Sequence, residues 1–176
     1  MNTRNASSVL MVLVLTGGSL RAEEIGLQSI GNWVVSETNS PLDYTPLIAA
    51  INRPRDGATD SAQLLLRCRT GRTSLAWNLF KLSENDRDYT IFYSVNNSGL
   101  LVAGKGTRAA GNEVLLQGDA ERILRSLPDE GDLNFRLVTR SGLAVESTFA
   151  LHGWAIVKTK LAAACRWLPV STHPRN

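Results

Sequence analysis

The sequence predicts an α+β domain, in which a mainly antiparallel β-sheet carries one short helix and a C-terminal helix packed on the sheet. Turn residues recur at short intervals from residue 30 to residue 118, which is typical of successive strands. Near the C-terminus the apolar residues change to a helical period. The chain contains two cysteines, Cys68 and Cys165. In an oxidising compartment such a pair most simply forms one disulfide, while two free thiols or a catalytic cysteine are the alternatives.

The first 22 residues predict a secretory signal peptide. Arg4 precedes an apolar run at residues 9–15, and residues 20–22 offer a cleavage site. The apolar run is too short to cross a bilayer, which takes about 20 residues. We therefore expect export without stable membrane insertion. The mature chain then comprises a single domain at residues 23–169 and a flexible tail at residues 170–176.

Charge argues against a nucleic-acid partner. Removal of residues 1–22 takes away Arg4 and Arg21 and no acidic residue, which lowers the formal net charge from +3 to +1. Binding to phosphate groups along a nucleic acid needs a concentrated basic surface. The charge therefore gives no reason to expect a nucleic-acid partner.

Nine segments have the apolar content and the flanking turn residues of strands. A turn is expected at residues 40–43, and polar loops are expected at residues 53–60 and 105–112. The predicted strands occupy residues 32–37, 45–52, 63–69, 72–79, 89–95, 100–103, 113–117, 132–140 and 145–151.

Residues 63–79 predict a tight hairpin, because Thr70-Gly71 separates two strand-like runs and glycine supplies a positive φ. A two-residue loop fixes the cross-strand pairs, and one face of the hairpin is then apolar and the other polar. The apolar face pairs Cys68 with Thr73, Leu66 with Leu75 and Leu64 with Trp77, and the polar face pairs Arg69 with Arg72, Arg67 with Ser74, Leu65 with Ala76 and Gln63 with Asn78. The disulfide partner of Cys68 must therefore cover the apolar face.

Two helices are predicted. Asp119 is a suitable N-cap for a helix at residues 120–127, which Pro128 ends. At the C-terminus, apolar residues at spacings of three and four form the stripe of an amphipathic helix that ends at Pro169, namely Trp154, Val157, Leu161, Ala164 and Leu168. Cys165 borders this stripe. We therefore expect the C-terminal helix to lie on the apolar face of the hairpin, bonded to Cys68.

No catalytic or metal-binding constellation stands out. His152 precedes the last helix in a capping or surface position, and His173 lies in the tail. The chain has no Gly-x-Ser-x-Gly elbow and no His-Glu-x-x-His zinc motif. The Gly-Lys-Gly run at residues 104–106 lacks the spacing and the βαβ setting of a nucleotide-binding loop. We therefore expect a non-enzymatic protein with no catalytic residues, no cofactor and no metal.

Arg67, Arg69 and Arg72 form the one cluster with binding potential. The hairpin register places all three on its polar face, where like charges are mildly destabilising unless they are compensated. Pairing with Asp or Glu from neighbouring strands is one interpretation. The other is a binding site for an acidic partner surface, a carboxylate or a phosphate.

Several segments resemble the VasI-like periplasmic proteins associated with type VI secretion, over about residues 33–167. The family has a Ser-Pro-Leu turn, an Arg-Cys strand followed by a Thr-containing strand, and a closing Cys-x-Trp. Tyr93-Ser94 departs from it, since the family has a Tyr-Arg strand there. The matching segments are Ser40-Pro41-Leu42-Asp43, Leu66-Arg67-Cys68 with Thr73-Ser74-Leu75, and residues 149–153 leading to Ala164-Cys165-Arg166-Trp167.

The resemblance implies a non-enzymatic accessory protein of the cell envelope. It supplies no catalytic residues. The leading expectation is a periplasmic module that binds a protein partner through the basic face or an exposed edge of its sheet. The alternative is an inhibitor of an envelope-directed hydrolase such as lysozyme, in which the loop at residues 53–60 or 105–112 would plug an active site. An enzyme is the third class, and a cleft with converging carboxylates would indicate it.

Overall fold

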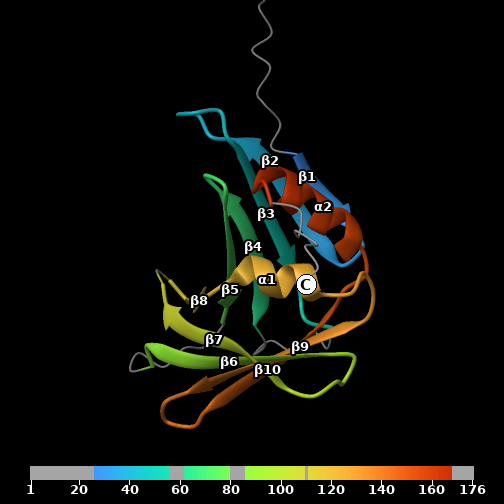
Figure 1. Ribbon diagram of the computed structural model, residues 1–176. Helices are drawn as coiled ribbons and strands as arrows, with labels where there is room; N and C mark the ends of the chain where they lie inside the picture. The colour runs from blue at the N-terminus through green and yellow to red at the C-terminus, as the bar shows by residue number, and fades with distance from the viewer. Residues whose placement is uncertain (1–25, 56–61, 80–85, 110, 168–176) are drawn as a thin grey trace, which may run out of the picture.

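The computed structural model describes residues 26–55, 62–79, 86–109 and 111–167 (Figure 1). Within these residues ten strands form one antiparallel sheet, in the order β1-β2-β3-β4-β5-β8-β7-β6-β9-β10. Two helices accompany the sheet, one of them close to the C-terminus. The predicted α+β fold is confirmed. The predicted signal peptide and tail lie outside the described residues.

The strands and helices follow the predicted order, with one addition. β1 was not predicted because its four residues before Ile30 are exposed and show no apolar alternation. The elements are β1 Gly26–Ile30, β2 Trp33–Asn39, β3 Pro46–Asn52, β4 Gln63–Arg69, β5 Arg72–Asn78, β6 Asp88–Val95, β7 Leu101–Arg108, β8 Glu113–Gln117, α1 Ala120–Ser126, β9 Asp132–Thr139, β10 Ala144–Ala150 and α2 Trp154–Ala164.

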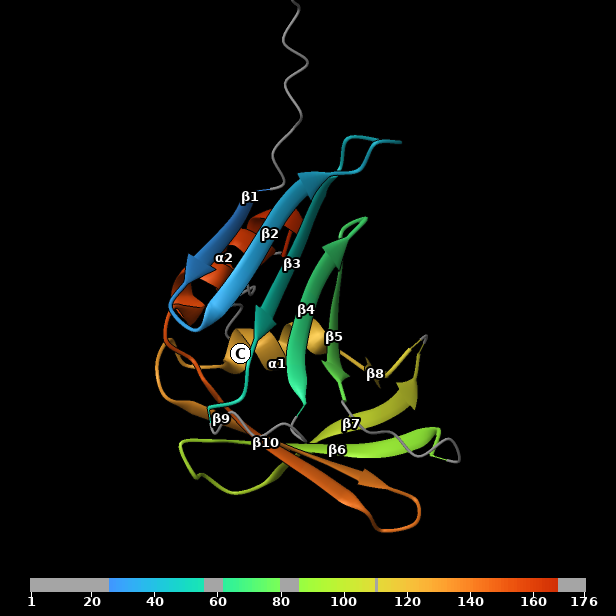
Figure 2. The same cartoon turned by 180° about the vertical axis from the view of Figure 1, so that it is seen from behind.

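The sheet is sharply bent. In Figures 1 and 2, strands β1–β5 stand at a steep angle to β6, β7, β9 and β10. Both helices lie on the same face of β1–β5, at the front in Figure 1 and behind the strands in Figure 2. The other face of β1–β5 is therefore free of helices.

The loop predicted at residues 105–112 is wrong in its first half, because Lys105–Arg108 continue strand β7. The physical reason lies at Gly106. A Cβ atom there would sit 2.7 Å from both Ile91 Cδ1 and Val114 Cγ1. Glycine lets β7 pack closely against these core side chains. A glycine-rich segment with the composition of a loop can therefore form a strand here.

The predicted hairpin register is confirmed, with Cys68 opposite Thr73, Leu64 opposite Trp77, and Arg69 opposite Arg72. The turn residues have left-handed backbones, with φ of 49° at Thr70 and 71° at Gly71. Two successive positive φ values match the twist of an antiparallel hairpin.

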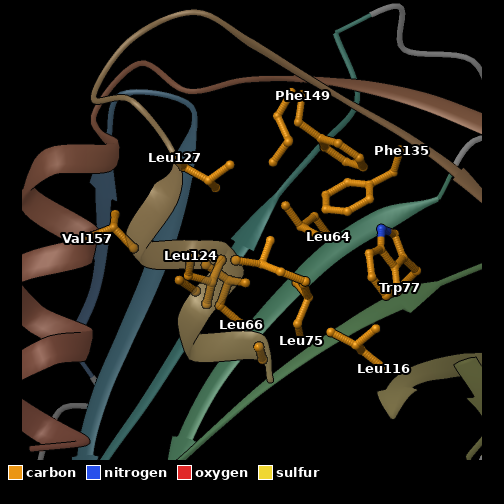
Figure 3. Packing of buried hydrophobic residues seen from close by; sticks show 14 of the residues in the cluster. Leu64, Leu66, Leu75, Trp77, Leu116, Leu124, Leu127, Phe135, Phe149 and Val157 are labelled. Atoms are coloured by element: carbon orange, nitrogen blue, oxygen red, sulfur yellow. The ribbon is translucent and has the colours of Figure 1, made fainter. Parts of the chain in front are cut away.

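The core fills the bend of the sheet. Figure 3 shows Leu124 of α1 lying over Leu66 and Leu75, and Trp77 meeting Phe135 of the opposite sheet half. The rings of Trp77 and Phe135 pack edge to face, with centroids 4.7 Å apart. Asp119 caps α1 as predicted, since its side chain accepts a hydrogen bond from the Arg122 backbone N–H at 2.9 Å. The α1 helix thereby closes the core over β4 and β5.

The predicted position of the C-terminal helix needs a correction. The disulfide between Cys68 and Cys165 is present, and the helix lies on the predicted face with Trp154, Val157 and Leu161 buried. However, α2 packs over β2, β3 and β4, and α1 covers β5. The reason is that Cys165 follows the last residue of α2, so the disulfide fixes only one end of the helix. Trp154 at the other end packs against Trp33 of β2, with ring centroids 5.3 Å apart.

None of the helices in the described ranges is long and apolar enough to span a membrane.

Candidate binding surface

The three predicted arginines lie on the face of β1–β5 that no helix covers, which is at the front in Figure 2. Strand alternation places Arg67 and Arg69 of β4 and Arg72 of β5 on this side, opposite the side that bears Cys68. Arg69 and Arg72 are the last pair before the turn of the β4–β5 hairpin. We call Arg67, Arg69 and Arg72, with the strand surface around them, the basic outer face.

Arg67 is held by an acidic side chain from another strand. Its guanidinium donates two hydrogen bonds to the Glu113 carboxylate of β8, Nη1 to Oε2 at 2.8 Å and Nη2 to Oε1 at 2.5 Å. The pair spans β5 diagonally across Ala76, whose small side chain leaves room for it. The hydrogen bonds lower the pKa of Glu113 and raise the pKa of Arg67. Of the two interpretations of the cluster, compensation by an acidic neighbour therefore applies to Arg67.

Arg69 and Arg72 differ from Arg67. Both side chains are exposed and directly opposite each other across the hairpin. Neither forms an ion pair with any of the residues that the structure describes. Like charges in this arrangement repel each other. Within the described ranges, these two positive charges at the hairpin end therefore have no acidic side chain to compensate them.

A depression of about 230 Å³ lies beside Arg67 and Arg69 on the outer face. Ser36 and Thr38 of β2, Leu47 and Ala49 of β3, and Arg67 and Arg69 of β4 contribute to its lining. The depression combines guanidinium groups with the apolar side chains of Leu47 and Ala49. This combination suits a protein surface that carries both carboxylates and apolar atoms.

The depression on the basic outer face is lined by guanidinium, hydroxyl and aliphatic groups. His152, by contrast, lies at the protein surface with Nδ1 3.5 Å from Glu130 Oε1. Gly153, rather than His152, is the N-cap of α2. In the described ranges no group of three or more His, Cys, Asp or Glu side chains is arranged to hold a metal ion.

Two residues were not predicted as part of the site, Leu42 and Tyr44. They lie at the end of the sheet where the β4–β5 turn lies. The turn predicted at residues 40–43 is present between β2 and β3. Leu42 and Tyr44 are 93% and 81% exposed there. The sequence does contain a sign of this, because turn positions are usually polar and a leucine and a tyrosine there indicate a role other than forming the turn.

Comparison with protein-family models, with curated proteins and with solved structures found no match to this chain.

The Arg67–Glu113 pair gives a testable pH dependence. Because the folded-state pKa of Glu113 is lowered, the pair stabilises the fold above the unfolded-state pKa of about 4.3, and this contribution is lost as the pH falls through the folded-state value. Glu113→Gln should reduce the free energy of unfolding by about 0.5–1 kcal/mol at pH 7. The effect is small because solvent screens this partly exposed pair. The difference from the unsubstituted protein should shrink below about pH 4.

Denaturant unfolding measured between pH 3 and pH 7 checks this dependence. Glu146→Gln is the matched control, because Glu146 pairs with Arg136 at 3.3 Å in a more exposed position. A difference for Glu113→Gln that stays constant down to pH 3 would contradict the assigned role of the carboxylate.

Proposed function

We propose that this protein is an exported, non-enzymatic binding module that recognises an acidic protein surface in the cell envelope. The observation that carries the proposal is the exposed pair Arg69 and Arg72, which lacks an acidic partner among the described residues and stands on a rigid hairpin. Exposed charges of one sign accelerate and orient association with a surface of the opposite sign.

Three features support this assignment over others. The Cys68–Cys165 disulfide suits an oxidising compartment, in keeping with the signal peptide that residues 1–22 predict. The net charge of +1 after the predicted cleavage gives no reason to expect a nucleic-acid partner. The resemblance to VasI-like proteins makes a secretion apparatus of type VI the leading setting for the partner.

An envelope-directed hydrolase such as lysozyme is the alternative partner. Of the two loops expected to plug an active site, residues 105–108 belong to strand β7, and most of residues 53–60 lie outside the described ranges. The specific observation that favours an inhibitor is instead the exposed loop between β2 and β3. Identification of the captured partner separates the two roles.

The double variant Arg69→Ala with Arg72→Ala should lose most partner binding, with at least a tenfold rise in Kd. Its folding should be unaffected, because both side chains are exposed and their mutual repulsion is removed. Affinity capture from an envelope extract of the source organism, followed by titration of the purified partner, measures the effect.

The matched control is Arg136→Ala with Arg140→Ala. It removes the same charge from exposed positions in and after β9. We expect this control to bind the partner like the unsubstituted protein. Equal binding by the Arg69/Arg72 variant and the unsubstituted protein would overturn the proposal.

A further inference from the structure

The six residues from Ser40 to Thr45 form a stiff loop between β2 and β3. The Ser40 backbone N–H donates to the Thr45 carbonyl at 2.8 Å, and the Tyr44 N–H donates to the Ser40 carbonyl at 2.9 Å. Asp43 adds a second set of bonds, since its Oδ1 accepts from the Thr45 hydroxyl at 2.9 Å and from the Thr45 N–H at 3.3 Å. Hydrogen bonds from Ser40 and Thr45 lower the pKa of Asp43, so its carboxylate is charged at neutral pH.

This loop presents its apolar side chains to solvent. Leu42 and Tyr44 are the two most exposed large hydrophobic residues in the described part of the chain. Tyr44 has a φ of 54°, a left-handed conformation that is rare for an aromatic residue. A strained backbone that holds exposed apolar side chains in fixed positions is typical of functional loops. An ordered loop backbone also lowers the conformational entropy that is lost on binding.

The loop lies at the same end of the sheet as the charged hairpin. In both Figure 1 and Figure 2 it projects beyond the β4–β5 turn, which carries Arg69 and Arg72 at its base. Leu47, which follows the loop in β3, lines the depression together with Arg69. Tyrosine and arginine, which lie close together at this end of the sheet, are among the residues most enriched in binding hot spots.

We infer that the β2–β3 loop inserts Leu42 and Tyr44 into a concave, apolar-floored site on the partner protein, whose rim carries carboxylates that meet Arg69 and Arg72. A projecting loop needs a recess, and the adjacent guanidinium groups select an acidic rim. This inference rests on the proposed function and specifies the shape of its partner. The two parts of the surface then have different tasks, because charges govern the association rate whereas buried apolar anchors govern dissociation.

Two loop variants and a control, compared with the Arg69/Arg72 variant, separate these tasks, and the probe is the partner protein purified after capture. Leu42→Ser with Tyr44→Asn removes both apolar side chains, and asparagine tolerates the left-handed backbone at position 44. We expect a 10- to 100-fold rise in Kd, mainly through faster dissociation, with an unchanged dependence on salt. Asp43→Ala keeps both anchors and loosens the loop, so it should also raise Kd. Leu143→Ser with Ile156→Asn, which changes two other exposed apolar residues, is the matched control and should bind normally.

A photoreactive phenylalanine analogue in place of Leu42 locates the contact. The cross-linked partner peptide should line a recess in the partner. Normal dissociation of the Leu42/Tyr44 variant, together with loss of binding by the Arg69/Arg72 variant, would overturn the loop inference and leave the proposed function intact. Normal binding by both variants would overturn both. A cross-link to a flat partner surface, or to a second copy of this chain, would also overturn the inference.

Discussion

Replacement of Cys68 and Cys165 together by alanine should lower the free energy of unfolding by about 2–5 kcal/mol. The disulfide joins positions 97 residues apart, so it restricts the unfolded chain strongly. In the folded state it holds the end of α2, the helix whose buried face covers β2 to β4. Its loss should therefore release the C-terminal helix first.

Guanidinium chloride unfolding of the double variant measures this effect, with the unsubstituted protein under reducing conditions as its control. Both samples should show the same lowered midpoint. An unfolding midpoint within error of that of the oxidised protein would show that packing alone holds α2. The disulfide would then not be needed to hold the end of α2 on the sheet.

Trp77→Ala should destabilise the fold by about 3–5 kcal/mol, since a large cavity would open in the core. The side chain of Trp77 is fully buried on β5, the strand that joins the first half of the sheet to β8. Its ring packs against Phe135 of β9, so it connects the two halves across the bend (Figure 3). The loss should affect the whole sheet rather than one hairpin.

Thermal and denaturant unfolding, followed by near-ultraviolet circular dichroism, check the role of Trp77. Trp167→Ala is the matched control, because this partly buried indole donates one hydrogen bond to Thr73 Oγ1 at 2.7 Å outside the bend. We expect a clearly smaller loss for the control. Equal losses for the two variants would contradict the placement of Trp77 at the junction.

The hairpin at residues 63–79 shows what local pattern can predict. A two-residue turn with alternating apolar and polar positions leaves a single register, and the structure has that register. The disulfide followed from the count of cysteines. These features depend on neighbouring residues and on composition, which are visible in the sequence.

The remaining features depend on long-range packing. Glu113 reaches Arg67 because β8 pairs with β5, and β6 and β7 are bypassed between them. No local pattern encodes that strand order. Gly106 belongs to a strand only because Ile91 and Val114 close around it. Likewise, the sequence predicts the turn at residues 40–43. It does not predict the exposure of Leu42, because that exposure depends on how the β2–β3 loop is placed relative to the rest of the folded sheet.

The salt dependence of partner binding measures whether the basic outer face is the surface that recognises the partner. Exposed charges interact over roughly 8 Å at physiological ionic strength, and the interaction weakens as salt is added. The Kd of the unsubstituted protein should therefore rise steeply with salt, and the dependence should be much shallower for the Arg69/Arg72 double variant. Identical salt dependence for the two proteins would contradict recognition of the partner through Arg69 and Arg72.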